Sequence, residues 1–353
     1  MEALPRKPFP LASTIYDIAK EAKVGIGTVS RVFNNHPSVS DETKKRVLRV
    51  ATRLNYHPHP YARGLARKRT NSILGMIPFF STFFFVEVLQ GVQSNLSESD
   101  FDLILYGVNH PDHVETSLRK HTLRGRGDGI LFFSMRMPEE FVQEYLRQKV
   151  PVVLIDTYHK HFDSFFVDNS EGAYVATKHL ISLGHERIGI LLANLESTPA
   201  RQRLEGFRRA MNEANLEVRS SWIKRSSSAK LDGFTRETGY ELMGEFLASR
   251  FDMPTAVFVS SDIQAAGALS AIEEAGMRCP DDIALVGFDD IELASHLGLT
   301  TMRQPMFEMG SLAAARLTER MADLTLPPKE MTYVPRLVVR RTSVQLEKEH
   351  STT

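Results

Sequence analysis

The sequence predicts a chain in two parts, a short all-α head followed by a longer α/β body of two doubly wound subdomains. Three observations predict this division. Residues 1–70 carry 14 Lys and Arg against 5 Asp and Glu, although the formal net charge of the whole chain is zero. The apolar residues of this first part recur with helical spacing. From residue 71 onward, short apolar runs alternate with helical stretches, which is typical of α/β proteins.

The composition excludes several classes of protein. Hydrophobic residues make up 42% and charged residues 24% of the 353 residues, as in ordinary globular chains of two or three domains. The chain has no run of about 18 apolar residues, and Met1–Pro10 lacks the apolar core of a secretory signal. The single cysteine, Cys279, excludes an intrachain disulfide framework and a CxxC metal site. We therefore expect a soluble cytoplasmic protein.

Three short helices are predicted in the head. Thr14 caps the first, with Asp17 completing a capping box. The second covers Thr28–Asn34, and Ser40 caps the third. The inner faces of the three helices consist of Ile15, Ile18, Ala19 and Ala22, then Val29, Val32 and Phe33, then Val47, Val50, Ala51 and Leu54. Two short helices joined by a tight turn and closed by a third form a helix-turn-helix unit.

A basic helix-turn-helix unit suits double-stranded DNA, because its second helix is small enough to enter the major groove. The outward side of that helix consists of Ile26, Gly27, Thr28, Ser30 and Arg31. Arg31 could bridge the O6 and N7 atoms of a guanine, whereas the hydroxyls of Thr28 and Ser30 suit phosphate oxygens. A three-helix bundle with no DNA role remains the alternative, since this geometry is widely reused.

A basic linker, residues 60–71, follows the head. Residues 61–67 could form about two helical turns, which would be marginal alone in water. In one interpretation the linker is a flexible tether. In the other it folds only on DNA and inserts Leu65 between base pairs in the minor groove.

Seven strands are predicted in the body: Ile73–Pro78, Asp102–Tyr106, Gly129–Phe133, Val150–Ile155, Arg187–Leu192, Thr255–Val259 and Ile283–Phe288. Helical patterns between them include Phe83–Leu96, Ala173–Leu183 and Ile263–Ala275. Several strands are apolar throughout, as in parallel sheets buried on both faces. A body of about 270 residues is too large for one core, which favours two doubly wound subdomains.

Ligands of such sheets bind beyond the carboxyl ends of the strands. This rule marks Asp156, Ser261 and Asp289. For Asp156 and Asp289, ligand binding and helix capping remain equally open, whereas Asp262 is expected to cap the helix that it precedes. An aromatic run follows the first body strand, and one or two of its rings, such as that of Phe84, could line the pocket.

Sequence runs in both parts carry a family resemblance. The runs are Thr14–Ala19, Thr28–Asn34, Tyr56–Pro58, Ala62–Leu65, Val167–Ala173, Gly184–Ile188, Arg203–Phe207, Val286–Asp290, Leu299–Thr301 and Leu337–Arg340. Together they resemble the lactose-repressor (LacI/GalR) family of bacterial transcription regulators. The resemblance implies a body similar to periplasmic sugar-binding proteins, with an effector in the cleft between its two subdomains.

The patterns and this resemblance together predict the site residues. Those expected to contact DNA are Thr14, Tyr16, Ile26, Gly27, Thr28, Ser30, Arg31, Asn34, Ser40, Tyr56, Ala62 and Leu65. Those expected to contact the effector are Phe84, Asp156, Arg203, Phe234, Ser261 and Asp289. The predicted domains are a head of residues 1–59, a linker of 60–71, a body of 72–345 and a tail of 346–353. The subdomains are expected to combine 72–168 with 303–333, and 169–302 with 334–345.

The sequence contains no GxSxG, HExxH or P-loop motif, so neither catalysis nor a cofactor or metal is expected. A sugar-binding transport protein would leave the basic head without a purpose, and an α/β enzyme would need catalytic residues that the sequence does not offer. The expected function is a repressor that binds a palindromic operator as a homodimer and responds to a small effector, a sugar by resemblance. A ligand-controlled activator and a nucleoside- or purine-responsive regulator are the alternatives. The tail lacks the heptads of a tetramerising coiled coil.

Overall fold

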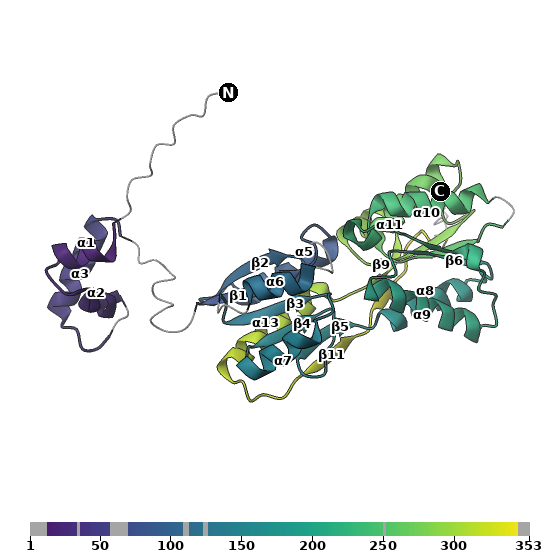
Figure 1. The fold of residues 1–353 in the computed structure, drawn as a ribbon. Helices are drawn as coiled ribbons and strands as arrows, with labels where there is room; N and C mark the ends of the chain where they lie inside the picture. Colours follow the sequence, from purple (N-terminus) through teal and green to yellow (C-terminus); the bar gives the residue numbers. More distant parts are fainter. Residues whose placement is uncertain are drawn as a thin grey trace, which may run out of the picture. The chain divides into compact units, whose positions relative to one another are not determined.

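The computed structural model describes residues 13–33, 36–56, 70–108, 113–122, 126–249 and 252–344 (Figure 1). These residues form a helical head and an α/β body, two separately compact units. The predicted DNA contacts at Asn34, Ala62 and Leu65, and the tail from residue 346, lie outside the described residues.

The head is a bundle of α1 (Ile15–Glu21), α2 (Ile26–Phe33) and α3 (Asp41–Arg53). The predicted capping box is confirmed: Asp17 N donates to Thr14 Oγ1, and Thr14 N donates to Asp17 Oδ2 over 2.7 Å. Ser40 caps α3 by accepting a hydrogen bond from Thr43 N. The predicted inner faces of the three helices pack into one apolar core.

The second helix begins two residues earlier than predicted, at Ile26 instead of Thr28. The carbonyl oxygen of Gly25 accepts hydrogen bonds from the N–H groups of Thr28, at 2.8 Å, and Val29, at 3.1 Å. These bonds start the helix directly after Gly25. The interruption between the first two helices is therefore shorter than the sequence pattern indicates, and Ile26 and Gly27 lie in the first helical turn.

The first sheet of the body has six strands in the order β11-β5-β4-β3-β1-β2. Their bounds are β1 (Ser72–Ile77), β2 (Asp102–Gly107), β3 (Gly129–Phe133), β4 (Val152–Ile155), β5 (Asp163–Val167) and β11 (Glu330–Tyr333). One face is covered by α5 (Phe83–Leu96) and α13 (Met306–Ala322), and the other by α6 (Val114–His121) and α7 (Glu139–Gln148). The central strands β1, β3 and β4 are buried along their whole length, which explains their apolar runs.

The second sheet has the order β12-β10-β9-β8-β6-β7. Its strands are β6 (Ile188–Leu192), β7 (Ile223–Arg225), β8 (Ala256–Val259), β9 (Ala284–Asp289), β10 (Thr300–Arg303) and β12 (Arg336–Val338). One face packs against α8 (Asn169–Ser182) and α9 (Thr198–Glu213), and the other against α10 (Arg236–Ala248), α11 (Asp262–Glu274) and α12 (Glu292–Leu297). Only β12, among the described pairings of this sheet, runs antiparallel to its neighbour.

The chain passes between the two sheets three times. It leaves β5 for α8 through Asp168, leaves β10 for α13 through Gln304 and Pro305, and leaves β11 for β12 through Val334 and Pro335. All three connections are short. Three short crossings therefore join the two layered halves of the body, and two of them belong to the C-terminal part of the chain.

All seven predicted strands are present, each within two residues of its predicted bounds. The sequence pattern missed β5, β7, β10, β11 and β12. These strands lie at an edge of their sheet or next to one. Four of them are three or four residues long, and β11 alternates exposed and half-buried residues. The half-exposed strands β7, β11 and β12 lack an uninterrupted apolar run because they remain near water. The strands β5 and β10 are mostly buried, but both begin with a pair of buried polar residues.

Two glycines bring α5 and α13 into backbone contact. A Cβ atom on Gly91 of α5 would overlap the carbonyl oxygen of Phe307, and a Cβ on Gly310 of α13 would overlap that of Val88. Any larger residue at either position would push the helices apart. Because α13 belongs to the C-terminal part of the chain, this contact fixes the late segment onto the first helix of the body.

A buried carboxylate holds the other end of α13. Asp163, at the start of β5, is fully buried and forms ion pairs with Arg316, at 2.8 Å, and with Arg320. The backbone N–H of Lys329 donates to the same carboxylate over 2.7 Å. Both guanidinium groups also donate to the carbonyl oxygen of Pro327. The cluster thus joins α13, β5 and the segment that leads into β11.

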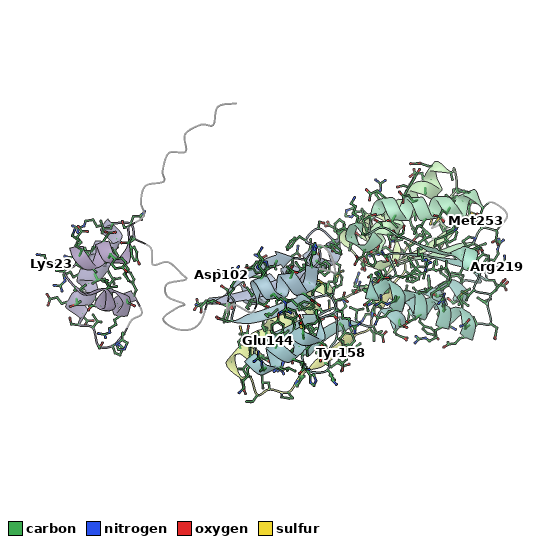
Figure 2. All side chains as sticks on the ribbon, viewed as in Figure 1. Lys23, Asp102, Glu144, Tyr158, Arg219 and Met253 are labelled. Carbon is green, nitrogen blue, oxygen red and sulfur yellow. The ribbon has the colours of Figure 1, made fainter. Side chains whose placement is uncertain are left out.

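Replacing this carboxylate should destabilise the body. Asp163→Asn removes the buried charge that two largely buried guanidinium groups share, although Arg316 keeps its ion pair with Glu319. The free energy of unfolding should therefore fall by about 3 kcal/mol. Urea unfolding followed by circular dichroism measures the change. The matched control is Asp102→Asn at the start of β2, where the carboxylate is exposed (labelled in Figure 2) and the change should stay within about 0.5 kcal/mol. Equal stability of the two variants would show that the cluster contributes nothing.

Candidate functional site

The outward side of α2 carries five of the nine described residues that are predicted to contact DNA. The side chains of Ile26 and Arg31 are exposed, as is Gly27, while Thr28 and Ser30 are half-buried. Tyr16 on α1 is also exposed, at 68%. These residues need no rearrangement of the head core to reach a partner. Lys23, which links α1 to α2 (labelled in Figure 2), adds an exposed cation to the same unit.

Three other predicted DNA contacts have structural roles in the head. Thr14 and Ser40 are the N-caps of α1 and α3, and both are exposed. Tyr56 is half-buried, and its ring lies 5.6 Å from that of Phe33, centroid to centroid. Tyr56 therefore fixes the end of α3 against the bundle. The hydroxyls of Thr14 and Ser40 are both hydrogen-bonded within their own helix turns, to Asp17 and to Thr43.

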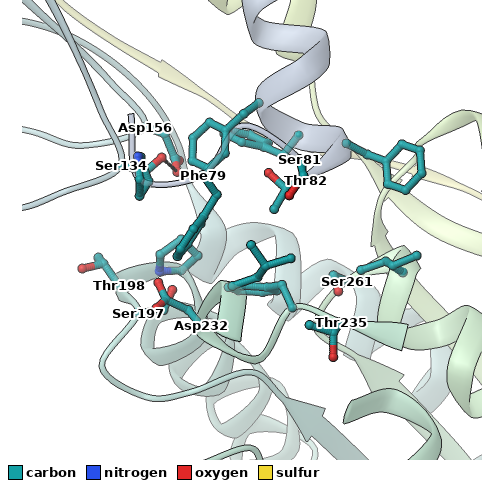
Figure 3. Close-up of a pocket in the computed structure, with 18 of the residues that line it drawn as sticks. Phe79, Ser81, Thr82, Ser134, Asp156, Ser197, Thr198, Asp232, Thr235 and Ser261 are labelled. Carbon is teal, nitrogen blue, oxygen red and sulfur yellow. Dashed lines mark hydrogen bonds between the residues drawn. The ribbon is translucent and has the colours of Figure 1, made fainter. Parts of the chain in front are cut away.

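The body contains a cavity of about 780 Å³ at the carboxyl ends of the strands of both sheets. Its walls come from the segment between β1 and α5, the ends of β3, β4 and β9, the first turns of α9, α10 and α11, and the loop before α10 (Figure 3). The structure places all six residues predicted for the effector in these walls: Phe84, Asp156, Arg203, Phe234, Ser261 and Asp289. Asp156 and Phe84 come from the first sheet and its helices, and the others come from the second.

Arg203 is the buried cation of the cavity. Its Nε donates to Asn169 Oδ1 over 2.9 Å, and its Nη1 donates to the carbonyl oxygen of Ser260. Its guanidinium carbon lies 3.7 Å from the ring centroid of Phe288, and Nη2 lies 3.7 Å from Asp289 Oδ1. Burial lowers the pKa of Arg203 from its ordinary value, and the carboxylates of Asp289 and Asp156 act against this shift. Two hydrogen bonds hold the side chain in place, and its guanidinium group lines the cavity.

Two carboxyl groups face this cation. Burial raises the pKa of Asp156 to about 6, against a hydrogen bond of 2.7 Å from Ser134 Oγ and the charge of Arg203. Burial likewise raises the pKa of Asp289 to about 6, opposed by Arg203 and by Gln304, whose Nε2 donates to Oδ1 over 2.6 Å. Both residues have positive φ angles, 55° and 122°. A strained backbone conformation, together with a carboxylate whose ionised form is destabilised by burial, is typical of functional sites.

The expectation that Asp262 caps α11 is wrong. Ser261 is the N-cap, accepting from Gln264 N, and Asp262 is the first helical residue. The buried carboxylate of Asp262 instead accepts from Ile291 N at 3.0 Å and from Thr301 Oγ1 at 2.5 Å. Its pKa is raised well above the ordinary value by burial and by the charge of Asp289. Asp262 therefore supports the turn that presents Asp289, a tertiary role that the local sequence does not reveal.

Several cavity residues escaped the sequence analysis. Ser134 follows β3 as Asp156 follows β4, so the rule of carboxyl ends could have found it. Thr82, before α5, has a buried Oγ1 without a hydrogen-bond partner in the described part of the chain. Leu231 and Asp232 line the cavity in left-handed conformation, with φ of 49° and 52°. No sequence signal marks these two, because neither residue type requires that conformation.

The described residues offer no group of three or more His, Cys, Asp and Glu that could hold a metal ion. Among the described helices, none is both long and apolar enough to cross a membrane.

The polar centre of the cavity, one cation between two carboxyl groups, suits a ligand with several hydrogen-bonding groups.

Comparisons with known proteins agree with both parts of the chain. Residues 14–59 match the bacterial regulatory proteins of the lacI family, and residues 177–343 match the periplasmic binding protein-like domain. Catabolite control protein A of Priestia megaterium is 32% identical over 94% of this chain and 99% of its own length. The HTH-type transcriptional repressor PurR of Mannheimia succiniciproducens is 36% identical over 93% of this chain and 98% of its own. A solved complex of the transcriptional regulator CelR with cellobiose has a TM-score of 0.67 and 28% identity, over 94% of this chain and 99% of that one.

Asp156→Asn should stabilise the body at neutral pH. A raised pKa means that the charged carboxylate costs stability above about pH 6, and that this cost disappears as the pH falls towards 4. The amide mimics the protonated form and can still accept from Ser134. At pH 7.5 we expect a gain of about 1–2 kcal/mol, less than the full shift because cavity water reaches the group. Thermal unfolding between pH 4 and 8 measures it, and a variant less stable than the parent at pH 7.5 would contradict it.

Gly27→Ala should leave the head folded. A Cβ atom at Gly27 would meet no atom within 4 Å, and alanine favours helix over glycine by up to about 1 kcal/mol. The substitution also adds a methyl group to the outward side of α2, so the preferred DNA sequence should change. The control is Gly91→Ala in α5, which should destabilise the body because its Cβ would overlap a backbone oxygen. Unfolding curves of both variants test the contrast, which a destabilised Gly27→Ala would refute.

Proposed function

This chain belongs to the lacI family of bacterial regulatory proteins, and on that premise we propose that it represses transcription by binding a palindromic operator as a homodimer under the control of a sugar. The DNA-binding part is the head, where α2 enters the major groove. Arg31 reads a base edge, and the hydroxyls of Thr28 and Ser30 contact phosphates. In such a dimer the two half-sites lie one helical turn, about 34 Å, apart. A regulator that acts on the chromosome works in the cytoplasm, and it needs no catalytic residue.

One observation carries the proposal for the effector: Arg203, Asp156 and Asp289 meet in a cavity whose lining also includes phenyl rings, among them those of Phe84 and Phe234, and other hydroxyl-bearing and charged side chains. Sugar hydroxyls can donate to both carboxylates and accept from the guanidinium group. The C–H faces of a sugar ring can lie against Phe84 and Phe234. The Oγ1 of Thr82, which has no hydrogen-bond partner among the described residues, offers one more hydrogen bond to a hydroxyl-rich ligand. The similarity to the regulator solved with cellobiose supports this class.

The cavity is placed to control the angle between the two halves of the body. Arg203 is hydrogen-bonded to Asn169, at the crossing from β5 to α8. Asp289 is hydrogen-bonded to Gln304, at the crossing from β10 to α13. A sugar that engages these two charged groups and Asp156 across the cavity binds one angle better than another. This difference in affinity is what an effector needs in order to change DNA binding.

Two measurements on the full-length protein test this function. Selection from a random pool of DNA duplexes should yield a palindromic operator, and affinity for it should fall steeply as salt rises, because phosphate contacts release counterions. A thermal-shift screen of sugars and nucleosides should then find the effector, because a bound ligand raises apparent stability. No binding to any duplex in dilute buffer would refute DNA binding. A stabilising nucleoside in place of a sugar would refute the proposed effector class.

Arg203→Lys should separate the two activities. Lysine keeps the charge but cannot form the fork of bonds to Asn169 and Ser260. Effector affinity in calorimetry should fall at least about tenfold, the cost of one hydrogen bond to a charged group. Operator affinity without effector should stay within about twofold of the parent, since the head is unchanged. An unaltered effector affinity would remove Arg203 from the site.

A further inference from the structure

A carboxylate outside the cavity holds the base of the linker. Asp128 Oδ1 accepts hydrogen bonds from the backbone N–H of Thr70, at 2.8 Å, and from Thr70 Oγ1, at 3.0 Å. Asp128 Oδ2 accepts from the N–H of Asn71 over 2.8 Å. The backbone N–H of Asp128 in turn donates to the carbonyl oxygen of Ser72 over 2.7 Å. Asp128 thus binds the last two residues of the linker through its carboxylate and the first residue of β1 through its backbone N–H.

This contact lies where the linker joins the first sheet of the body. Asp128 directly precedes β3, a strand in the interior of the first sheet, and Thr70 and Asn71 directly precede β1. Asn71 has a φ of 49°, so the chain turns sharply where the linker becomes strand. Asparagine tolerates this left-handed conformation better than most residues. Without the carboxylate, nothing in the described hydrogen bonding would hold the N–H groups of Thr70 and Asn71.

We propose that Asp128 is a positioning residue for DNA binding, which fixes the point at which the linker leaves the body. This inference rests on the proposed function. In a homodimer, two linkers must deliver two heads to one operator. Ordering a residue costs about 1–2 kcal/mol of backbone entropy, so a linker base that is already ordered loses less freedom on binding. Non-specific DNA binding through a single head does not need a fixed linker base, so it gains nothing from the ordering of that base.

The sign of the charge effect makes the proposal testable. Asp128→Asn removes one negative charge, which by itself favours any DNA. It also turns one of the two acceptors into an NH₂ donor that faces an N–H group. A loss of operator affinity therefore cannot come from the charge change. Asp102→Asn, at the exposed start of β2 in the same sheet, makes the same charge change without touching the linker and is the matched control.

The experiment uses the full-length protein, an operator selected by the parent, and a scrambled duplex of equal length, with fluorescence anisotropy at one salt concentration. We expect Asp128→Asn to lose about tenfold in affinity for the operator and to bind the scrambled duplex no more weakly than the parent. Asp102→Asn should match or slightly exceed the parent on both duplexes. Asp128→Asn that binds the operator as tightly as Asp102→Asn, or that loses equally on both duplexes, overturns the proposal.

The contact of Asp128 with Thr70 and Asn71 is called the clamp below. Two further measurements test the clamp independently of folding and of the proposed function. Hydrogen exchange of the peptide that covers residues 70 and 71 should be slow in the parent and fast in Asp128→Asn, and fast exchange in the parent overturns the proposal. Should Asp128→Asn fail to fold, Thr70→Val removes only the hydroxyl bond and should weaken operator binding about threefold. Unchanged operator affinity of that variant then overturns the proposal. A parent protein that selects no duplex at all refutes DNA binding itself and leaves the exchange result to judge the clamp.

Discussion

The body depends on the burial of one guanidinium group. A cation taken out of water costs several kcal/mol unless hydrogen bonds and counter-charges replace the lost hydration. Arg203 meets this requirement with a side chain from the start of α8, a carbonyl oxygen from the end of β8, and an aspartate and a phenyl ring from the end of β9. These groups must converge on one point, and that convergence shapes the floor of the cavity. The same charge keeps Asp156, on the opposite wall, from being more strongly shifted towards its neutral form.

The two halves of the body are held by contacts of different kinds. Within each half, helices approach one another closely enough that only glycine fits, as at Gly91 and Gly310 between α5 and α13, and at Gly239 and Gly267 between α10 and α11. Such packed pairs resist deformation. Between the halves, three short crossings carry the chain, and polar side chains at two of them reach the charged residues of the cavity. The cores thus lie within the halves, and the contacts at the crossings between them are polar.

Hydrogen bonds to backbone N–H groups order two smaller parts of the chain, the head and the base of the linker. The head has a small apolar core. The capping hydrogen bonds at Thr14 and Ser40 therefore contribute a large share of its stability. At the base of the linker, the carboxylate of Asp128 supplies order by accepting hydrogen bonds from the N–H groups of Thr70 and Asn71. In both places, hydrogen bonds to backbone N–H groups fix where a segment begins.

The sequence by itself determined the class of each part, the buried strands and the capping residues. Periodicity, uninterrupted apolar runs and local capping patterns depend only on neighbours along the chain, so β3 and the capping box of α1 could be predicted closely. The rule of carboxyl ends also placed Asp156 and Asp289 beside the cavity. The tertiary structure alone decided the edge strands such as β11, the role of Asp262 and the clamp of Asp128. A half-exposed strand has no apolar run, and the partners of the carboxylates of Asp262 and Asp128 lie 29 to 58 residues away along the chain. Interactions between such distant residues leave no local pattern to read.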